Sequence, residues 1–141
     1  MRWDGPDGHF VDDDRTFVDV ERVHRWLSEQ SYWAAGRELD VVRRSIEQSL
    51  TLGLYSPSGE QLGVCRWVTD YETFAWLADV FVDEAVRGRG LGVFLVSCAA
   101  GHPKVCDVPL QLLGTRDAHD IYRKVGFVPV PEPWRWMERR R

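Results

Sequence analysis

The chain has little cysteine and no long apolar run, and each shortage excludes a class of protein. Its three cysteines, Cys65, Cys98 and Cys106, are odd in number and form no Cys-x-x-Cys pair, so neither a disulfide framework nor a zinc site is indicated. No segment is apolar enough to span a membrane, and the residues after Met1 lack the basic and apolar regions of a signal peptide. We therefore expect a cytoplasmic protein with no membrane partner and no bound metal.

The chain also lacks an excess of positive charge. Its net charge of −4 at pH 7 argues against general affinity for nucleic acids. Acidic side chains crowd the first 21 residues; we interpret them as solvated surface, the alternative being that they attract a cationic substrate. What is present fits a single domain, because 141 residues with 44% hydrophobic side chains and seven tryptophans predict one core spanning residues 1–141.

The hydrophobic pattern predicts two helices, then a meander of strands, then alternating strands and helices, which is a mixed α/β order. Asp19 is placed to cap a first helix, in which Val20, Val23, Trp26 and Leu27 share one face. Further helices are expected at Leu39–Leu50, Leu91–Cys98 and Ala118–Val125, and strands at Phe10–Val11, Thr16–Val18, Leu52–Tyr55, Gln61–Thr69, Phe74–Val82, Val108–Leu113 and Phe127–Val130. The segment Pro131–Met137 is expected to add a final edge strand.

The most informative segment is the glycine-rich loop at residues 87–92, Arg-Gly-Arg-Gly-Leu-Gly, which lies between an apolar strand and an amphipathic helix. Glycines let the backbone fold tightly and approach a ligand closely. The helix that follows aims unpaired N–H groups and its positive dipole end at an anion. Two arginines add positive charge to the loop. The pattern therefore predicts a site for an anionic, phosphate-bearing ligand.

Two common phosphate-binding patterns do not fit this loop. The Walker pattern requires Lys-Ser or Lys-Thr after its last glycine, and neither follows here. The dinucleotide pattern Gly-x-Gly-x-x-Gly requires a third glycine at a position that Val93 or Leu95 occupies. The loop is thus neither a nucleotide P-loop nor a dinucleotide fingerprint.

The spacing Arg87-x-x-Gly90-x-Gly92 resembles the acetyl-coenzyme A loop of the GNAT N-acetyltransferase superfamily. A second segment, Ala118-x-x-x-Tyr122-x-x-x-Gly126-Phe127, resembles the late motif of the same superfamily and follows in the same order. The resemblance covers essentially the whole chain. It implies a GNAT fold: a mixed, mostly antiparallel sheet of six to seven strands, flanked by about four helices and splayed at the cofactor site.

The resemblance also implies where acetyl-coenzyme A binds as the acetyl donor. Pantetheine lies against the exposed strand edge, and the pyrophosphate rests on the N–H groups that start the helix. Threonine stands where many members carry asparagine and keeps a hydroxyl for the cofactor. The implied cofactor-binding residues are Val80, Phe81, Val82, Arg87, Gly88, Arg89, Gly90, Leu91, Gly92, Val93 and Thr115.

The implied reaction is direct attack of a primary amine on the thioester in a ternary complex. Tyr122 is the expected general acid, because a phenol with a pKa near 10 is protonated at neutral pH; its alternative role is packing. The base stays open between Asp79, Asp70, His119 and a water relay. Two aromatic residues between the first helices either line the substrate pocket or pin the helix pair: Tyr32 and Trp33.

Two functions of different classes follow from the resemblance. The first is an N-acetyltransferase for an amine of a small molecule or peptide. The second is a non-catalytic acyl-coenzyme A sensor or interaction module, against which Tyr122 argues because a sensor needs no general acid. The acceptor and the length of the acyl chain stay open. The aromatic C-terminal segment suggests a homodimer formed by edge pairing.

Overall fold

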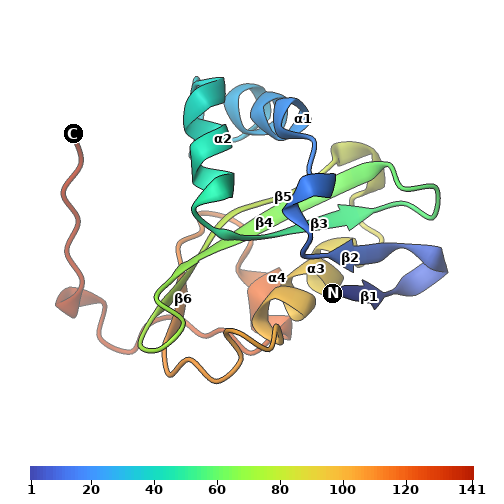
Figure 1. The fold of residues 1–141 in the computed structure, drawn as a ribbon. Coiled ribbons are helices and arrows are strands. Elements are labelled where there is room, and N and C mark those ends of the chain that lie inside the picture. The colour runs from blue at the N-terminus through green and yellow to red at the C-terminus, as the bar shows by residue number, and fades with distance from the viewer.

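Six strands form one open sheet with helices on both faces (Figure 1). The structure, a computed structural model, describes residues 1–141. The strands are β1 (Arg2–Asp4), β2 (Phe10–Asp12), β3 (Leu50–Tyr55), β4 (Gln61–Thr69), β5 (Ala75–Val82) and β6 (Gln111–Leu113). They lie in chain order, and every neighbouring pair is antiparallel except β5 and β6, which are parallel. The predicted mixed, mostly antiparallel sheet is confirmed.

Four α-helices cover the sheet. They are α1 (Val20–Arg25), which continues into a π-helical turn η3 (Trp26–Gln30), then α2 (Leu39–Glu47), α3 (Leu91–Ala100) and α4 (His119–Lys124). In Figure 1, α1 and α2 lie over one face of the sheet, and α3 and α4 lie under the other. Short 3₁₀ turns occur at η1 (Pro6–Gly8), η2 (Arg15–Phe17), η4 (Glu84–Val86) and η5 (Pro133–Arg135). None of the helices has the length and apolar character that crossing a bilayer requires.

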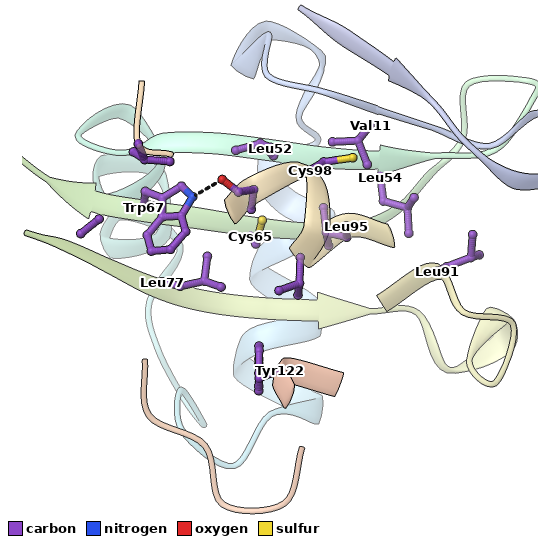
Figure 2. Close-up of a cluster of buried hydrophobic side chains, with 14 of the residues drawn as sticks. Val11, Leu52, Leu54, Cys65, Trp67, Leu77, Leu91, Leu95, Cys98 and Tyr122 are labelled. Carbon is purple, nitrogen blue, oxygen red and sulfur yellow. Dashed lines mark hydrogen bonds between the residues drawn. The ribbon is translucent and has the colours of Figure 1, made fainter. Parts of the chain in front are cut away.

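Each face of the sheet has its own hydrophobic cluster. The larger cluster joins α3 to the sheet, and Figure 2 shows Leu95 of α3 among side chains from β3, β4 and β5. Within it, the indole Nε1 of Trp67 donates a hydrogen bond of 2.9 Å to the carbonyl oxygen of Ala99. The smaller cluster packs α1, η3 and α2 against Val64 and Phe81. The two clusters hold β4 and β5 between them and so fix the strand that carries the site.

The first two predicted helices and their buried faces are confirmed, although the second helix ends earlier than predicted. The carboxylate of Asp19 accepts a hydrogen bond of 3.0 Å from the backbone N–H of Arg22 and caps α1. Val23 is buried on α1, and Val42 and Ile46 are buried on α2. Leu50 begins β3 rather than ending α2.

The strand predicted at Thr16–Val18 is wrong, because Arg15–Phe17 forms the 3₁₀ turn η2. The carboxylate of Asp14 accepts hydrogen bonds from the backbone N–H of Thr16 at 3.0 Å and from its hydroxyl at 2.6 Å. This local cap satisfies backbone groups that a strand would have paired with a neighbour. Strand β1 was not predicted, since three residues are too few for a clear alternation.

The strands predicted at Phe127–Val130 and Pro131–Met137 are also absent, and the strand predicted at Val108–Leu113 is reduced to β6. Pro129, Pro131 and Pro133 have no N–H to donate to a ladder. The segment after α4 therefore runs as irregular chain and the turn η5 before the C-terminus (Figure 1).

Candidate active site

A β-bulge in β5 sets up the site. Val64 pairs with Phe81 and Arg66 with Ala78, so two residues of β5 lie opposite the single intervening residue of β4. The first of these two, Asp79, has a φ of 53°, in the left-handed region. An extra residue bends a strand and shifts its alternation. Accordingly, Leu77 packs in the α3 cluster, whereas Phe81 packs in the α1 cluster.

Beyond the bulge, β5 has an open edge. The parallel pairing of β5 with β6 ends at Leu77 and Leu113. From there the chain leaves β6 through residues 114–118 and enters α4, so Ala78–Val82 has no strand neighbour on that side. The splay predicted from the sequence is therefore present. An open strand edge presents backbone donors and acceptors that an extended ligand can pair with.

The glycine-rich loop forms a row of free amides at the end of this edge. Gly88 and Gly90 have φ values of 81° and 77°, and no atom lies within 4 Å of where a Cβ would stand on either. No backbone N–H from Gly88 to Val93 donates a hydrogen bond within the chain; the first paired amide of α3 is that of Phe94, which donates to Gly90. Consecutive unpaired amides at a helix N-terminus form a binding site for an anion.

The two arginines of this loop differ in their environment. The Nε of Arg87 donates to the carbonyl oxygen of Val82 at 2.8 Å, and its guanidinium lies 5.0 Å from the centre of the Phe81 ring. Arg87 therefore ties the loop to the end of β5. Arg89 is exposed and forms no hydrogen bond or ion pair within the chain, so its charge is available to a ligand.

Two cavities meet at Tyr122. The first, of about 630 Å³, runs from the free amides along Val80–Val82 to Tyr122; we call it the donor groove. The second, of about 620 Å³, lies between the loop after η3, the bulge and the loop before α4; we call it the acceptor cavity. Tyr122 and Val80 line both. The two cavities therefore adjoin at these residues, and we call this place the junction.

A contact between two loops crosses the boundary of the two cavities. The hydroxyl of Tyr32 accepts a hydrogen bond of 2.8 Å from the backbone N–H of Arg116. The guanidinium of Arg116 also stacks 3.9 Å from the centre of the Tyr32 ring, as a cation–π pair. Trp33 packs edge-on against Tyr32, with ring centres 5.1 Å apart. The predicted site residues Tyr32 and Trp33 thus line both cavities.

Comparison with known proteins decides the family. The family described as "Acetyltransferase (GNAT) domain" matches residues 47–129. The chain belongs to the GNAT acetyltransferase family. A crystal structure of an inferred GNAT acetyltransferase from Xanthomonas campestris pv. campestris is 37% identical, with a TM-score of 0.90, and the match covers 96% of this chain and 95% of that chain.

Two other similar proteins have lower sequence identity. An inferred acetyltransferase of Gibberella zeae is 25% identical, over 84% of this chain and 78% of that protein. A crystal structure of an inferred acetyltransferase from Deinococcus radiodurans is 16% identical, with a TM-score of 0.74, and covers 100% of this chain and 94% of that chain. At that identity the last likeness supports the fold alone.

The late GNAT motif holds Tyr122 in place. Gly126, with a φ of 103°, ends α4, and the backbone N–H of Phe127 donates to the carbonyl oxygen of Tyr122 at 3.1 Å. The Phe127 ring packs edge-on against the phenol, with centres 6.1 Å apart. Burial raises the pKa of Tyr122 above its ordinary value. The phenol therefore stays protonated at neutral pH, and its hydroxyl forms no hydrogen bond within the chain.

Asp79, a predicted base, is fully engaged in this GNAT chain. Its Oδ1 accepts from the indole of Trp33 at 2.9 Å, and its Oδ2 accepts from Arg37 at 2.8 Å and Arg66 at 2.7 Å. Burial by itself raises the pKa of Asp79, but Arg66, Arg37 and the indole outweigh it and hold the pKa below its usual value. A carboxylate paired in this way is a weak proton acceptor.

The other predicted bases lie away from the junction. Asp70 sits in the turn between β4 and β5 and accepts hydrogen bonds from three backbone amides and from the Thr73 hydroxyl. These bonds, the Thr73 hydroxyl first, lower its pKa. His119 is exposed and lines neither the donor groove nor the acceptor cavity. His119 instead lines a separate cavity of about 300 Å³, which Tyr122 also lines. The structure thus brings Asp70 nowhere near Tyr122, and it places His119 beside Tyr122 but outside the two larger cavities.

Thr115 lies on the acceptor side. Its hydroxyl accepts a hydrogen bond of 3.1 Å from the backbone N–H of Ala118, next to the start of α4, and Thr115 lines the acceptor cavity but not the donor groove. Arg37, Arg66 and Arg116 were not predicted at the site. A charged residue inside the apolar strand Gln61–Thr69 was the one available signal for Arg66, whereas Arg37 and Arg116 reach the site only through the folding of loops.

Proposed function

We propose that the chain is an acetyl-CoA-dependent N-acetyltransferase that acts on a primary amine of a small molecule or peptide. One observation carries the proposal: the free amides from Gly88 to Val93 lie along a groove that adjoins a second cavity at Tyr122, which lines both. An anionic donor and a separate acceptor need this arrangement. Family membership supports the same reaction class.

The residues present fit coenzyme A. The amides from Gly88 to Val93 suit its pyrophosphate, with Arg89 free to add a charge-assisted bond. The unpaired edge at Val80–Val82 suits the amides of the pantetheine arm, which pair as an additional strand would. At Gly88 and Gly90, the open space and the positive φ favour glycine and leave the approach to the amides clear.

The chemistry requires a proton for sulfur and a neutral amine. Acetyl-CoA supplies an acyl carbon activated as a thioester. The amine nitrogen bonds to that carbon as the carbon–sulfur bond breaks, and Tyr122 Oη gives its proton to the leaving sulfur. Asp79 is paired, Asp70 is hydrogen-bonded within the turn between β4 and β5, and His119 lines neither the donor groove nor the acceptor cavity. We therefore assign removal of the amine proton to solvent in the junction.

Coenzyme A binding tests the donor site. Calorimetric titration of the full chain with coenzyme A should give saturable binding, and the melting temperature should rise with ligand concentration, because a ligand that binds only the native state stabilises it. Acetyl-CoA with a panel of amines should then release free thiol. Protein that neither binds coenzyme A nor is stabilised by it contradicts the proposal.

Replacing Tyr122 tests the general acid. Tyr122→Phe should lower kcat by about 10²-fold or more and leave the affinity for coenzyme A unchanged, because only the hydroxyl is lost and the aromatic ring and its packing remain. The matched control is Tyr55→Phe, since Tyr55 is buried, has no hydrogen-bond partner for its hydroxyl and lines neither cavity. Unchanged turnover of Tyr122→Phe would show that another group protonates the thiolate.

A further inference from the structure

The acceptor cavity carries an unbalanced positive charge. Arg37 and Arg66 both donate to the same carboxylate oxygen of Asp79, at 2.8 and 2.7 Å. Two guanidinium groups therefore share one carboxylate, and the cluster has a net charge of about +1. The other oxygen of Asp79 is taken by the indole of Trp33. Asp79 has no remaining capacity to balance the second arginine.

The surrounding charges do not compensate this excess. Arg116 and Arg140 also line the acceptor cavity, but each has its own acidic partner: Asp117 at 3.6 Å and Glu138 at 3.1 Å, respectively. The excess charge is thus localised at the two arginines that share Asp79, Arg37 and Arg66. Their side chains are 23% and 15% exposed, so they face the cavity rather than bulk water.

Both arginines line the acceptor cavity and keep unpaired donors. Arg66 uses Nε for Asp79 and Nη1 for the hydroxyl of Ser49, at 3.0 Å, which leaves Nη2 unpaired. Arg37 uses Nη1 alone, which leaves Nε and Nη2 unpaired. Partly buried charge without a counter-ion is unfavourable, and a guanidinium fork matches the planar oxygens of a carboxylate. The cluster is therefore a built site for an anion.

We propose that the amine accepted by this enzyme also carries a carboxylate, which binds Arg37 and Arg66 while the amine reaches Tyr122. This inference rests on the proposed function and names its substrate class. A carboxylate is favoured over a phosphate because its single negative charge balances the excess of about +1. The rings of Trp33 and Trp76, which line the same cavity, suit an apolar or aromatic body. The acceptor class is thus an amino acid or a small molecule of that chemistry.

Matched pairs of acceptors test the carboxylate. Thiol release from acetyl-CoA by the full chain is measured with L-phenylalanine against phenethylamine and with L-leucine against isoamylamine. The carboxylate-bearing member of each pair should have a kcat/KM higher by about tenfold or more. Equal or better use of the decarboxylated amines overturns the proposal. The pair β-alanine and O-phosphoethanolamine separates the two anions, and a preference for the phosphate overturns the assignment to carboxylate.

The variant Arg37→Gln tests the site itself. It leaves Asp79 balanced by Arg66 and removes the excess charge, so the KM for L-phenylalanine should rise by about tenfold, with the change in KM rather than in kcat. Arg37→Lys keeps the positive charge but lacks the forked guanidinium group, so it should raise the KM for L-phenylalanine by a smaller factor. The control is Arg123→Gln, because Arg123 pairs with Asp120 at 3.2 Å outside both cavities. Equal KM values for Arg37→Gln and the control overturn the proposal.

A direct binding measurement tests the carboxylate site even if the protein acetylates none of the acceptors in the panel. L-Phenylalanine is titrated by NMR into the full chain saturated with coenzyme A, at millimolar concentrations. Binding should occur in the wild type and be lost in Arg37→Gln. No binding, or equal binding to both, overturns the carboxylate site. Failure of coenzyme A itself to bind is a separate result, which contradicts the proposed function instead.

Discussion

Two titratable residues near the junction are held in opposite protonation states by their surroundings. Tyr122 is buried with no cation beside its hydroxyl, and burial raises its pKa. Asp79 is also buried, yet two arginines and an indole N–H hold its pKa below the usual value. Tyr122 thus stays neutral and Asp79 stays ionised through the neutral range. Neither residue is expected to change charge where the enzyme works.

The pH dependence of activity should therefore belong to the acceptor. The value of kcat/KM should rise with pH as the acceptor ammonium loses its proton. Between about pH 6 and 9 no base of the enzyme should add a second titration to this profile. Profiles measured with two acceptors of different amine pKa should have midpoints that differ by the same amount. A midpoint common to both acceptors would instead indicate a base on the enzyme.

The backbone does not require glycine at position 92, but the donor groove does. It lies in the first turn of α3 at an ordinary helical φ, and a Cβ would stand 3.6 Å from Cδ1 of Ile121 and 3.9 Å from Cγ2 of Val82. Both neighbours line the donor groove. Gly92→Ala should raise the free energy of unfolding by about 0.5–1 kcal/mol and weaken coenzyme A binding, because the methyl group occupies the groove.

At Gly90, unlike Gly92, the backbone conformation itself favours glycine. Its φ of 77° lies in the left-handed region, so Gly90→Ala should lower the free energy of unfolding by about 1–2 kcal/mol. Denaturant unfolding and coenzyme A titration measure both variants. If the two alanines change stability in the same direction, the stated difference in backbone conformation is contradicted.

At the scale of elements, the site depends on how β5 and the helices around it are fixed. The bulge at Asp79 turns Phe81 toward α1 and η3, where its ring stacks on Trp26 with centres 5.4 Å apart. The same bulge coincides with the end of pairing between β5 and β6, at Leu77 and Leu113. One extra residue in one strand thus separates the paired half of β5 from the half that is open to a ligand.

The cap of α1 tests an element that supports the site without lining it. Asp19→Ala removes the hydrogen bond of 3.0 Å to the backbone N–H of Arg22 and should lower the free energy of unfolding by about 1 kcal/mol. Coenzyme A affinity should be unchanged, since Asp19 lines neither cavity. Asp107→Ala is the control, because Asp107 is exposed and forms no ion pair. Equal stability of the two variants would contradict the capping role.

At the scale of the whole molecule, Asp79 joins segments that are far apart in the sequence. Through it the loop after η3, strand β4 and strand β5 are tied together by hydrogen bonds from Trp33, Arg37 and Arg66. Because its folded pKa is lowered, its contribution to stability is present above the ordinary carboxyl pKa of about 4 and is lost as the pH falls through the folded value.

Asp79→Asn tests this link. Asparagine tolerates the positive φ, so the change removes mainly the charge and leaves two arginines without a counter-ion. At pH 7 the free energy of unfolding should fall by about 3 kcal/mol. The variant should also lose less stability than the wild type as the pH falls below about 4, because only the wild type has this carboxylate to protonate. Denaturant unfolding at several pH values measures both, and parallel profiles would contradict the role given to Asp79.

Local features of the sequence were sufficient to predict the glycine-rich loop. The spacing of Arg87, Gly90 and Gly92 predicted a turn with unpaired amides, and the structure has it, because positive φ values and a helix start are decided within a few residues. The first two helices, the strands Gln61–Thr69 and Ala75–Val82, and the cap at Asp19 were predictable for the same reason. The local pattern wrongly predicted strands at Thr16–Val18 and Phe127–Val130. At the first segment a side-chain cap takes up the backbone groups that a strand would pair, and at the second prolines remove them.

The sequence by itself determined the loop that suits a phosphate and the family, because both are read from short motifs whose residues lie close together in the chain. The open α/β sheet followed from the family resemblance. Only the tertiary structure decided that Asp79 is an ion-paired carboxylate and that Arg37 and Arg66 share it across the acceptor cavity. Those contacts join residues that are 42 and 13 positions apart, respectively. The net charge of such a cluster depends on which side chains meet in space, and the order of residues along the chain does not encode that directly.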